Sequence, residues 1–168
     1  MKFIISSTFL LKGLQSVSGI IASNSTLPIL DNFLFELKGE ELTITASDLE
    51  TTLIVKLPVT MAEENGVVAV PAKTLIDYLK NLPEMPVTFR ISMADMTIQL
   101  SAGENDSTIT GYKGEEYPRI PVLEDVSSTE VNSGVIADAI AKTLFATGND
   151  DMRPVMSGVY FQLSENDI

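Results

Sequence analysis

The chain contains neither cysteine nor histidine among its 168 residues. Without cysteine it forms no disulfide bond and offers no thiol nucleophile. Without either residue it lacks the side chains on which most zinc and haem sites depend. Catalytic dyads that use imidazole as the base are excluded as well. Whatever this protein does, it does without imidazole or a sulfur nucleophile.

Basic residues are also scarce. Lys and Arg number 11 against 23 Asp and Glu, which gives a net charge of −12. The composition is nevertheless that of a folded protein, because 45% of the residues are hydrophobic and only 20% are charged. The length fits one complete domain and a piece of a second.

No stretch approaches the roughly 18 apolar residues that a membrane span requires. The apolar run at 3–11 superficially resembles a secretion signal, but Lys12 interrupts it and no cleavage site follows. We therefore expect a soluble, cytoplasmic protein with no membrane partner.

A strand followed by a helix occurs twice, separated by 65 residues. An alternating apolar pair and then helical spacing define the pattern in both places. The first copy consists of Phe3, Ile5, Leu10, Leu11 and Leu14, and the second of Val68, Val70, Leu75, Ile76 and Leu79.

A hairpin is repeated with a constant shift of 54 residues. Its first copy consists of Phe33, Phe35, Leu37, Leu42, Ile44 and Ala46, and its second of Val87, Phe89, Ile91, Met96, Ile98 and Leu100. The same shift carries Leu53 and Val55 onto Ser107 and Ile109, so a weaker third strand follows each hairpin. The sequence predicts an α+β fold from two halves, about 1–58 and 66–111, each a strand, a helix and a three-stranded antiparallel meander.

The predicted helices, 8–22, 72–82 and 134–146, are amphipathic and carry a net charge of +2, from four lysines and two acids. That leaves seven basic and 21 acidic residues for the rest of the chain. If the outer faces of these helices point to one side of the protein, that side is mildly positive and can bind a polyanion weakly. Alternatively, lysines on solvated helix faces serve solubility alone.

A third copy begins after the proline-containing segment 117–121. A shift of 126 carries Pro28, Phe33 and Phe35 onto Pro154, Val159 and Phe161. We predict a complete first domain at 1–122, a linker at 123–128 and a truncated second domain at 129–168. A lone helix and strand cannot bury both apolar faces, so we expect residues 129–168 to borrow a partner, to remain mobile, or to be the visible part of a longer protein.

Four segments resemble the amino-terminal domain of the bacterial DNA sliding clamp family, the beta subunit of DNA polymerase III. They are 23–30 (SNSTLPIL), 46–52 (ASDLETT), 70–73 (VPAK) and 116–118 (EYP). The match runs in order through residues 1 to about 122 and continues more loosely to Leu163. The resemblance implies a DNA-clamp fold, with helices on one layer and antiparallel sheets on the other.

The resemblance further implies a ring of two subunits, each of three similar domains, with helices lining a hole around duplex DNA. Such a homodimer is a processivity factor in DNA replication: it is not an enzyme, uses no cofactor, and binds the polymerase III catalytic subunit and the clamp loader. The DNA-facing positions that it implies here are Lys12, Asn24, Ser25, Lys73, Lys80 and Arg153. Asn24 and Ser25 are neutral where some relatives carry a basic residue.

Two further sites follow from the resemblance. The strand Ser107, Thr108, Ile109 and Thr110 matches the edge that pairs with the neighbouring subunit, although an unpaired edge is also an aggregation hazard. Met156 matches a wall of the groove that binds client peptides. Because most of that groove would come from residues absent here, Met156 is alternatively a core residue.

Acidic pairs leave a second class of function open, a carboxylate-metal hydrolase. Candidates are Asp48 with Glu50, Glu63–Glu64, Glu104 with Asp106, Glu115–Glu116 and 149–151. None fits a calcium-loop pattern or stands beside a nucleophile, and most fall at predicted turns. We predict no metal site and no catalytic residue. A β-rich binding module for carbohydrate or protein is a third possibility.

Overall fold

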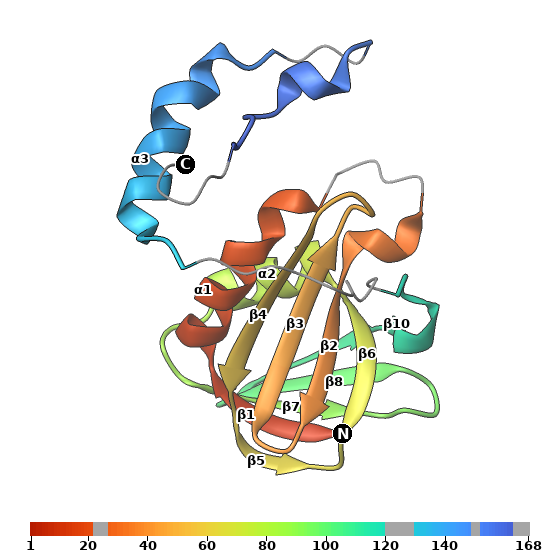
Figure 1. Cartoon of the computed structure of the whole chain (residues 1–168). Coiled ribbons are helices and arrows are strands. Elements are labelled where there is room, and N and C mark those ends of the chain that lie inside the picture. The colour runs from red at the N-terminus through yellow and green to blue at the C-terminus, as the bar shows by residue number, and fades with distance from the viewer. Residues whose placement is uncertain (22–26, 120–129, 149–151, 163–168) are drawn as a thin grey trace. The chain divides into compact units, whose positions relative to one another are not determined.

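The computed structural model describes residues 1–21, 27–119, 130–148 and 152–162 (Figure 1). It divides into two compact units, Met1–Pro121 and Val122–Ile168, called unit 1 and unit 2 below.

Unit 1 alternates strands and helices in the order that the repeats predict. Its helices are α1 (Ser7–Val17) and α2 (Ala72–Lys80), and its short 3₁₀ turns are η1 (Ser18–Ile20), η2 (Pro28–Asp31) and η3 (Gly114–Glu116). Its strands in the described residues are β1 (Lys2–Ser6), β2 (Asn32–Lys38), β3 (Glu41–Ser47), β4 (Thr52–Pro58), β5 (Thr60–Glu63), β6 (Gly66–Pro71), β7 (Pro86–Ile91), β8 (Thr97–Ala102), β9 (Asn105–Thr110) and β10 (Tyr112–Lys113).

The two halves exchange their first strands. One sheet, sheet A, has the order β5-β1-β7-β8-β9, so β1 of the first half joins the meander of the second. Sheet B has the order β10-β6-β2-β3-β4, so β6 of the second half joins the meander of the first. All pairs are antiparallel. Neither sheet belongs to one half.

The exchanged strands pair in equivalent registers. Phe3 of β1 lies opposite Phe89 of β7, and Val68 of β6 lies opposite Phe35 of β2. These are the positions that the shifts of 65 and 54 residues relate to one another. The hairpins differ in register by two residues, since Phe35 lies opposite Ile44 whereas Phe89 lies opposite Leu100 and not Ile98. The sequence repeat is thus a structural repeat in the pairing of the exchanged strands, while the second hairpin has a longer turn.

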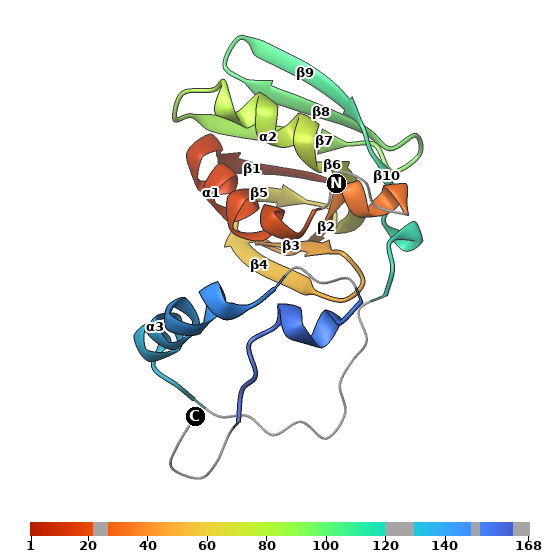
Figure 2. The same cartoon turned by 90° about the horizontal axis from the view of Figure 1, so that it is seen from above.

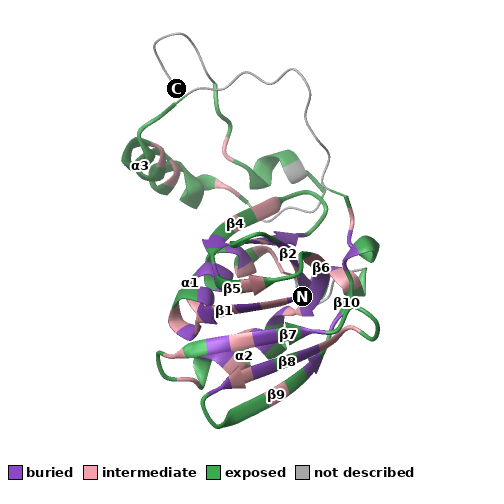
Figure 3. Ribbon diagram, turned by 90° about the horizontal axis from the view of Figure 1, so that it is seen from below, coloured by how far each residue is buried: buried purple, intermediate pink, exposed green. Residues whose placement is uncertain are grey.

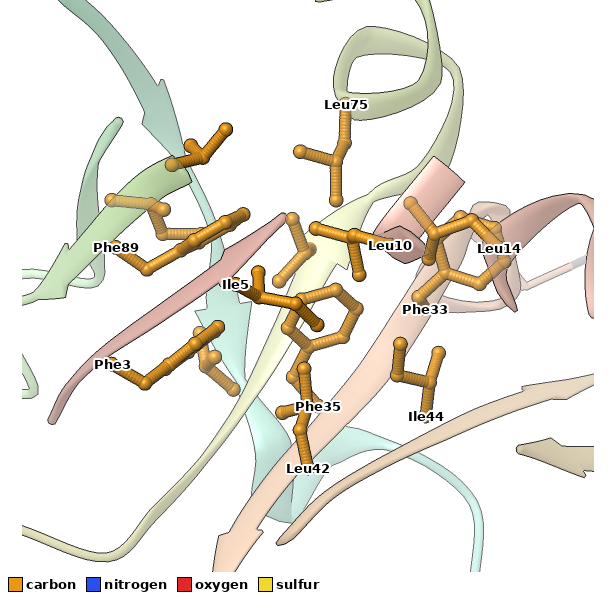
Figure 4. Packing of buried hydrophobic residues seen from close by; sticks show 14 of the residues in the cluster. Phe3, Ile5, Leu10, Leu14, Phe33, Phe35, Leu42, Ile44, Leu75 and Phe89 are labelled. Carbon is orange, nitrogen blue, oxygen red and sulfur yellow. The ribbon is translucent and has the colours of Figure 1, made fainter. Parts of the chain in front are cut away.

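Aromatic rings join the two sheets at the centre of unit 1 (Figure 4). The Phe3 and Phe89 rings are stacked, with centroids 4.7 Å apart and planes 8° apart. The Phe89 ring also lies 6.3 Å from that of Phe35 in sheet B, tilted by 45°. Leu10 of α1 and Leu75 of α2 belong to the same fully buried cluster. Both helices and both sheets therefore share one hydrophobic core.

The predicted fold class is confirmed, with two further differences in detail. The first helix, predicted to reach residue 22, changes to a 3₁₀ turn after Val17. The hydroxyls of Ser16 and Ser18 donate to the carbonyls of Gly13 and Gln15, which is the local hydrogen bonding that weakens helix ends. The strands β5 and β10 were not predicted, because they are short and have no clear apolar alternation.

A smaller cluster forms outside the main core and contains an unsatisfied hydroxyl. Leu30 of η2, Ala69 of β6 and Tyr117 are each less than 5% exposed and pack together. The Tyr117 hydroxyl is buried and has no hydrogen-bond partner among the described residues. Burial raises the pKa of Tyr117, and the nearby backbone of Ser47 opposes that rise. Tyr117 thus attaches the end of unit 1 by apolar packing.

Unit 2 consists of α3 (Ser133–Thr143), η4 (Leu144–Ala146) and η5 (Pro154–Ser157) in its described residues. The helix falls where the sequence predicts it, and η5 corresponds to η2 at the predicted shift of 126. The predicted strand does not form in residues 159–162. The ribbon of this unit has mostly the colour of exposed residues (Figure 3), and Phe145 is 84% exposed.

The assignment of Met156 to a core is wrong for this unit, because Met156 is 56% exposed. In unit 1 each half buries its apolar residues against strands of the other half. The described part of unit 2 has no such strands. The boundaries predicted for the linker and the second domain remain predictions.

The strand exchange predicts that neither half of unit 1 folds alone. Peptides 1–64 and 65–121 should each lack a cooperative urea transition, since β1 would keep only the short strand β5, β6 would keep only β10, and both would lose their partner in the meander of the other half. Mixed in equal amounts, they should recover the circular dichroism spectrum of the intact 1–121 chain. A cooperative transition of 1–64 alone would contradict the exchange.

The buried Tyr117 hydroxyl predicts a neutral or stabilising effect of Tyr117→Phe. A buried polar group without a partner costs about 1–3 kcal/mol, so its removal should raise the free energy of unfolding by as much as about 1 kcal/mol. Urea unfolding measures the change, and Tyr112→Phe, at a residue that is 51% exposed, is the control. A loss above about 1 kcal/mol would show that the hydroxyl has a partner.

Candidate nucleic-acid interface

Helix α1 is fixed at its first turn by serine side chains. The Ser6 hydroxyl caps the helix by accepting a hydrogen bond from the Phe9 amide at 3.5 Å. The Ser7 hydroxyl donates to the Pro83 carbonyl at 2.7 Å and accepts from the Met85 amide at 3.1 Å. The start of α1 is therefore attached to the segment that leads from α2 into β7.

Helix α2 begins directly after Pro71, whose missing N–H costs nothing at a helix start. Beyond its C-terminus the Asn81 side-chain amide donates to the Asp77 carbonyl at 2.7 Å. Leu75 and Leu79 face the core, and the opposite face is exposed. Helices α1 and α2 contact each other and lie side by side in unit 1 (Figure 2).

The three lysines predicted to face DNA lie on the exposed sides of these adjacent helices. Lys12 belongs to α1, and Lys73 and Lys80 belong to α2. Within the described part of the chain, none of the three forms an ion pair. Their ammonium groups are thus available to an external anion.

Three lysines on the strands differ from those on the helices, because each is neutralised by a neighbouring glutamate. The Lys2 ammonium lies 2.7 Å from a carboxylate oxygen of Glu63. Lys38 pairs with Glu36 at 2.8 Å, and Lys56 pairs with Glu41 at 2.9 Å. Hydrogen bonding to Lys2 lowers the pKa of Glu63, and hydrogen bonding to Glu41 raises the pKa of Lys56.

A single acid interrupts the lysines of the helix pair. Asp77 is exposed on α2, one turn after Lys73 and one turn before Lys80. Helix α1 contains no acid. Three lysines and one aspartate give the two helices together a charge of +2, on a chain whose net charge is −12.

The remaining predicted contacts stay predictions. Asn24 and Ser25 lie outside the described residues. Arg153 belongs to unit 2, where it is exposed and directly precedes η5. The geometry of the site therefore depends on Lys12, Lys73 and Lys80.

Strand β9 is the last strand of sheet A and includes the predicted interface residues. Its described partner is β8 on one side only. Ile109 points into the core, whereas Thr108 and Thr110 are exposed and Ser107 is half-buried. This edge offers unpaired backbone groups to another strand.

Asp48 and Glu50 lie in the turn between β3 and β4, whereas Glu63 ends β5, Asp106 belongs to β9, and Glu115 and Glu116 belong to η3. Residues 149–151 lie outside the described residues. An Asp48 carboxylate oxygen accepts hydrogen bonds from the amides of Glu50 and Thr51 at 3.0 and 2.6 Å. A similar turn at Asp95, which bonds to Ser92 and Thr97, lowers the pKa of Asp95. Among the residues that the structure describes, no three Asp or Glu side chains converge on one point. Nor is any helix in the described ranges long and apolar enough to cross a membrane.

Comparison with known proteins identifies close relatives. The family model "DNA polymerase III beta subunit, N-terminal domain" matches residues 1–121. The Beta sliding clamp of Haemophilus influenzae is 31% identical over 169 residues, covering 99% of this chain and 45% of that protein. The Beta sliding clamp of Vibrio cholerae is 30% identical over 163 residues, covering 97% and 44%.

Solved structures show the same relationship. The crystal structure of a sliding clamp (DNA polymerase III subunit beta) from Pseudomonas aeruginosa, bound to griselimycin, has a TM-score of 0.85 at 29% identity. The match covers 93% of this chain and 42% of that one. The chain thus spans under half the length of the relatives that it matches.

Proposed function

Because the chain belongs to the family of DNA polymerase III beta subunit N-terminal domains, we propose that it forms part of a DNA sliding clamp. The observation that carries the proposal is the pair of adjacent helices with three exposed lysines free of ion pairs in the described residues. On the strands, lysines with glutamate neighbours are already neutralised. The positive charge of the helices is thus available to the phosphates of DNA.

The proposed clamp encircles duplex DNA as a ring of two subunits and holds the polymerase on its template. Its partners are the polymerase III catalytic subunit and the clamp loader, and it works in the cytoplasm without catalysing a reaction. A small positive excess suits this role. Each phosphate contact adds affinity but slows movement along the duplex, so a charge of +2 on two helices attracts DNA without fixing it in register.

Strand β9 is proposed to close the ring. Its exposed edge would pair with a strand of the neighbouring subunit, because backbone groups at a sheet edge bond readily to a second strand. Arg153, Asn24 and Ser25 are proposed as further DNA contacts and Met156 as part of a client groove. These assignments depend on the resemblance.

Topology provides the main test. The full-length protein, loaded onto a nicked circular plasmid, should stay bound during gel filtration and be released when the plasmid is cut once. A protein that stays equally bound to linear DNA is a site binder and not a clamp.

Removing the helix lysines should weaken the attraction to DNA in this chain. Contacts of three lysines with phosphates contribute about −2.7 to the slope of log K against log salt. In the variant Lys12→Ala, Lys73→Ala, Lys80→Ala the slope should become less negative by about that amount, measured by fluorescence anisotropy with a labelled duplex. The control carries the same change in charge on the strands, as Lys2→Ala, Lys38→Ala, Lys56→Ala. Equal losses in both variants would mean that net charge, and not the helix pair, attracts DNA.

Asp77→Asn should tighten DNA binding. A charge roughly 8 Å from a phosphate contributes about 0.5 kcal/mol in water, which corresponds to about a twofold gain in affinity at low salt. Glu40→Gln removes an exposed acid from the turn between β2 and β3 and is the control. Identical affinities of the two variants would show that Asp77 does not face the duplex.

A further inference from the structure

A groove on unit 1 has no role in the proposed clamp function. It lies where β1 ends and α1 begins, beside the end of β4 (Figure 1), and has a volume of about 360 Å³. Its main lining residues are Ile4, Phe9, Pro58, Glu84, Met85 and Pro86. None of the three helix lysines lines it. We call it the Phe9 groove.

The walls of the Phe9 groove are fixed before any ligand arrives. The Ser7 hydroxyl joins the start of α1 to the segment of Pro83 and Met85 through the two hydrogen bonds described above, and the Ser7 amide donates to the Met85 carbonyl at 2.9 Å. On the other wall the Thr60 hydroxyl donates to the Ile4 carbonyl at 3.3 Å. Two prolines, Pro58 and Pro86, restrict the backbone further. Binding would require little ordering of the groove itself.

Phe9 is the unusual residue of this region. It is 42% exposed, although the exposed face of α1 is otherwise polar with Lys12, Gln15 and Ser16. The sequence did not single it out, because Leu10 and Leu11 beside it follow the same apolar pattern. An exposed aromatic ring beside a preformed apolar groove is typical of a recognition site. A volume near the lower end of known ligand sites suits one or two side chains.

The charge of the groove selects among possible occupants. Glu84 is its one ionisable lining residue, is exposed, and has no ion pair in the described part of the chain. A second copy of this chain would bring another net charge of −12 toward it. A basic partner is attracted both by Glu84 and by the charge of the whole chain.

We propose that the Phe9 groove binds a short segment of another protein, with one or two large apolar side chains beside a lysine or arginine. The apolar side chains lie against Phe9, Ile4 and Met85, and the cation pairs with Glu84. This site contains none of the lysines proposed to face DNA, so the proposal can be tested independently of the clamp function.

Nuclear magnetic resonance on the ¹⁵N-labelled chain tests the proposal. The probe is the capped peptide Ala-Leu-Phe-Arg-Ala, and the comparison peptides carry Glu in place of Arg, or Ser-Ser in place of Leu-Phe. The amide signals of Ile5, Ser6, Phe9, Glu84 and Met85 should shift with the first peptide. Its affinity should exceed that of either comparison peptide at least fivefold. No shift, shifts mapping elsewhere, or equal affinity for the Glu peptide would overturn the proposal.

Variants separate the two parts of the recognition. Glu84→Gln, at an exposed site, should remove the preference for Arg over Glu while leaving the fold intact. Phe9→Ser should weaken the binding of the Arg peptide at least fivefold, and Ile54→Ser is the control, because Ile54 is 51% exposed on β4 outside the groove. If Phe9→Ser unfolds the chain, Glu84→Gln still decides the role of charge. Shifts of the groove signals with protein concentration alone would assign the groove to a second copy and overturn the proposal.

Discussion

The exchange of first strands between the two halves is the constraint on which unit 1 depends. Strand β1 pairs with β7, and β6 pairs with β2, so each sheet is complete only when both halves are present. Each exchanged strand leads directly into a helix, α1 after β1 and α2 after β6. The exchange therefore brings the two helices together, and with them the lysines that face solvent. Phe89 fixes the same arrangement from inside, because its ring contacts Phe3 in its own sheet and Phe35 in the other.

This arrangement separates the charges of unit 1 by layer. On the strands, Lys2, Lys38 and Lys56 each form an ion pair with a glutamate of the same or an adjacent strand. On the helices, the exposed faces carry lysines with Asp77 as their one acid. An acidic protein can thus present a weakly cationic face without a strongly basic composition. Weak attraction spread over a surface is compatible with movement along a duplex, which tight contacts at a few phosphates would oppose.

Unit 2 illustrates the same constraint, namely that a half of this fold needs the strands of a second half. It has a helix and a 3₁₀ turn at the positions expected of a half, yet apolar residues such as Phe145 and Met156 remain exposed in its described part. A half of this fold buries its apolar residues against the strands of a second half. The Phe9 groove is different in kind, because it is an apolar surface on a unit whose core is complete. The exposed apolar residues of unit 2 are of the kind that a second half of the same fold covers. The Phe9 groove is proposed to bind a segment of a different protein.

The sequence by itself determined the repeats, because alternation and helical spacing are properties of neighbouring residues. Phe33 to Ala46 and Val87 to Leu100 identify the hairpins, and Leu10 and Leu75 identify the core sides of the helices. The resemblance then indicated the family and the candidate lysines. The tertiary structure alone decided that β1 pairs with the opposite meander, that α1 and α2 adjoin, and that Phe9 stays exposed. The pairing of strands that lie far apart in the chain depends on which surfaces come into contact in the folded protein. The same is true of the exposure of Phe9 beside Leu10 and Leu11. Local periodicity contains no information about such contacts.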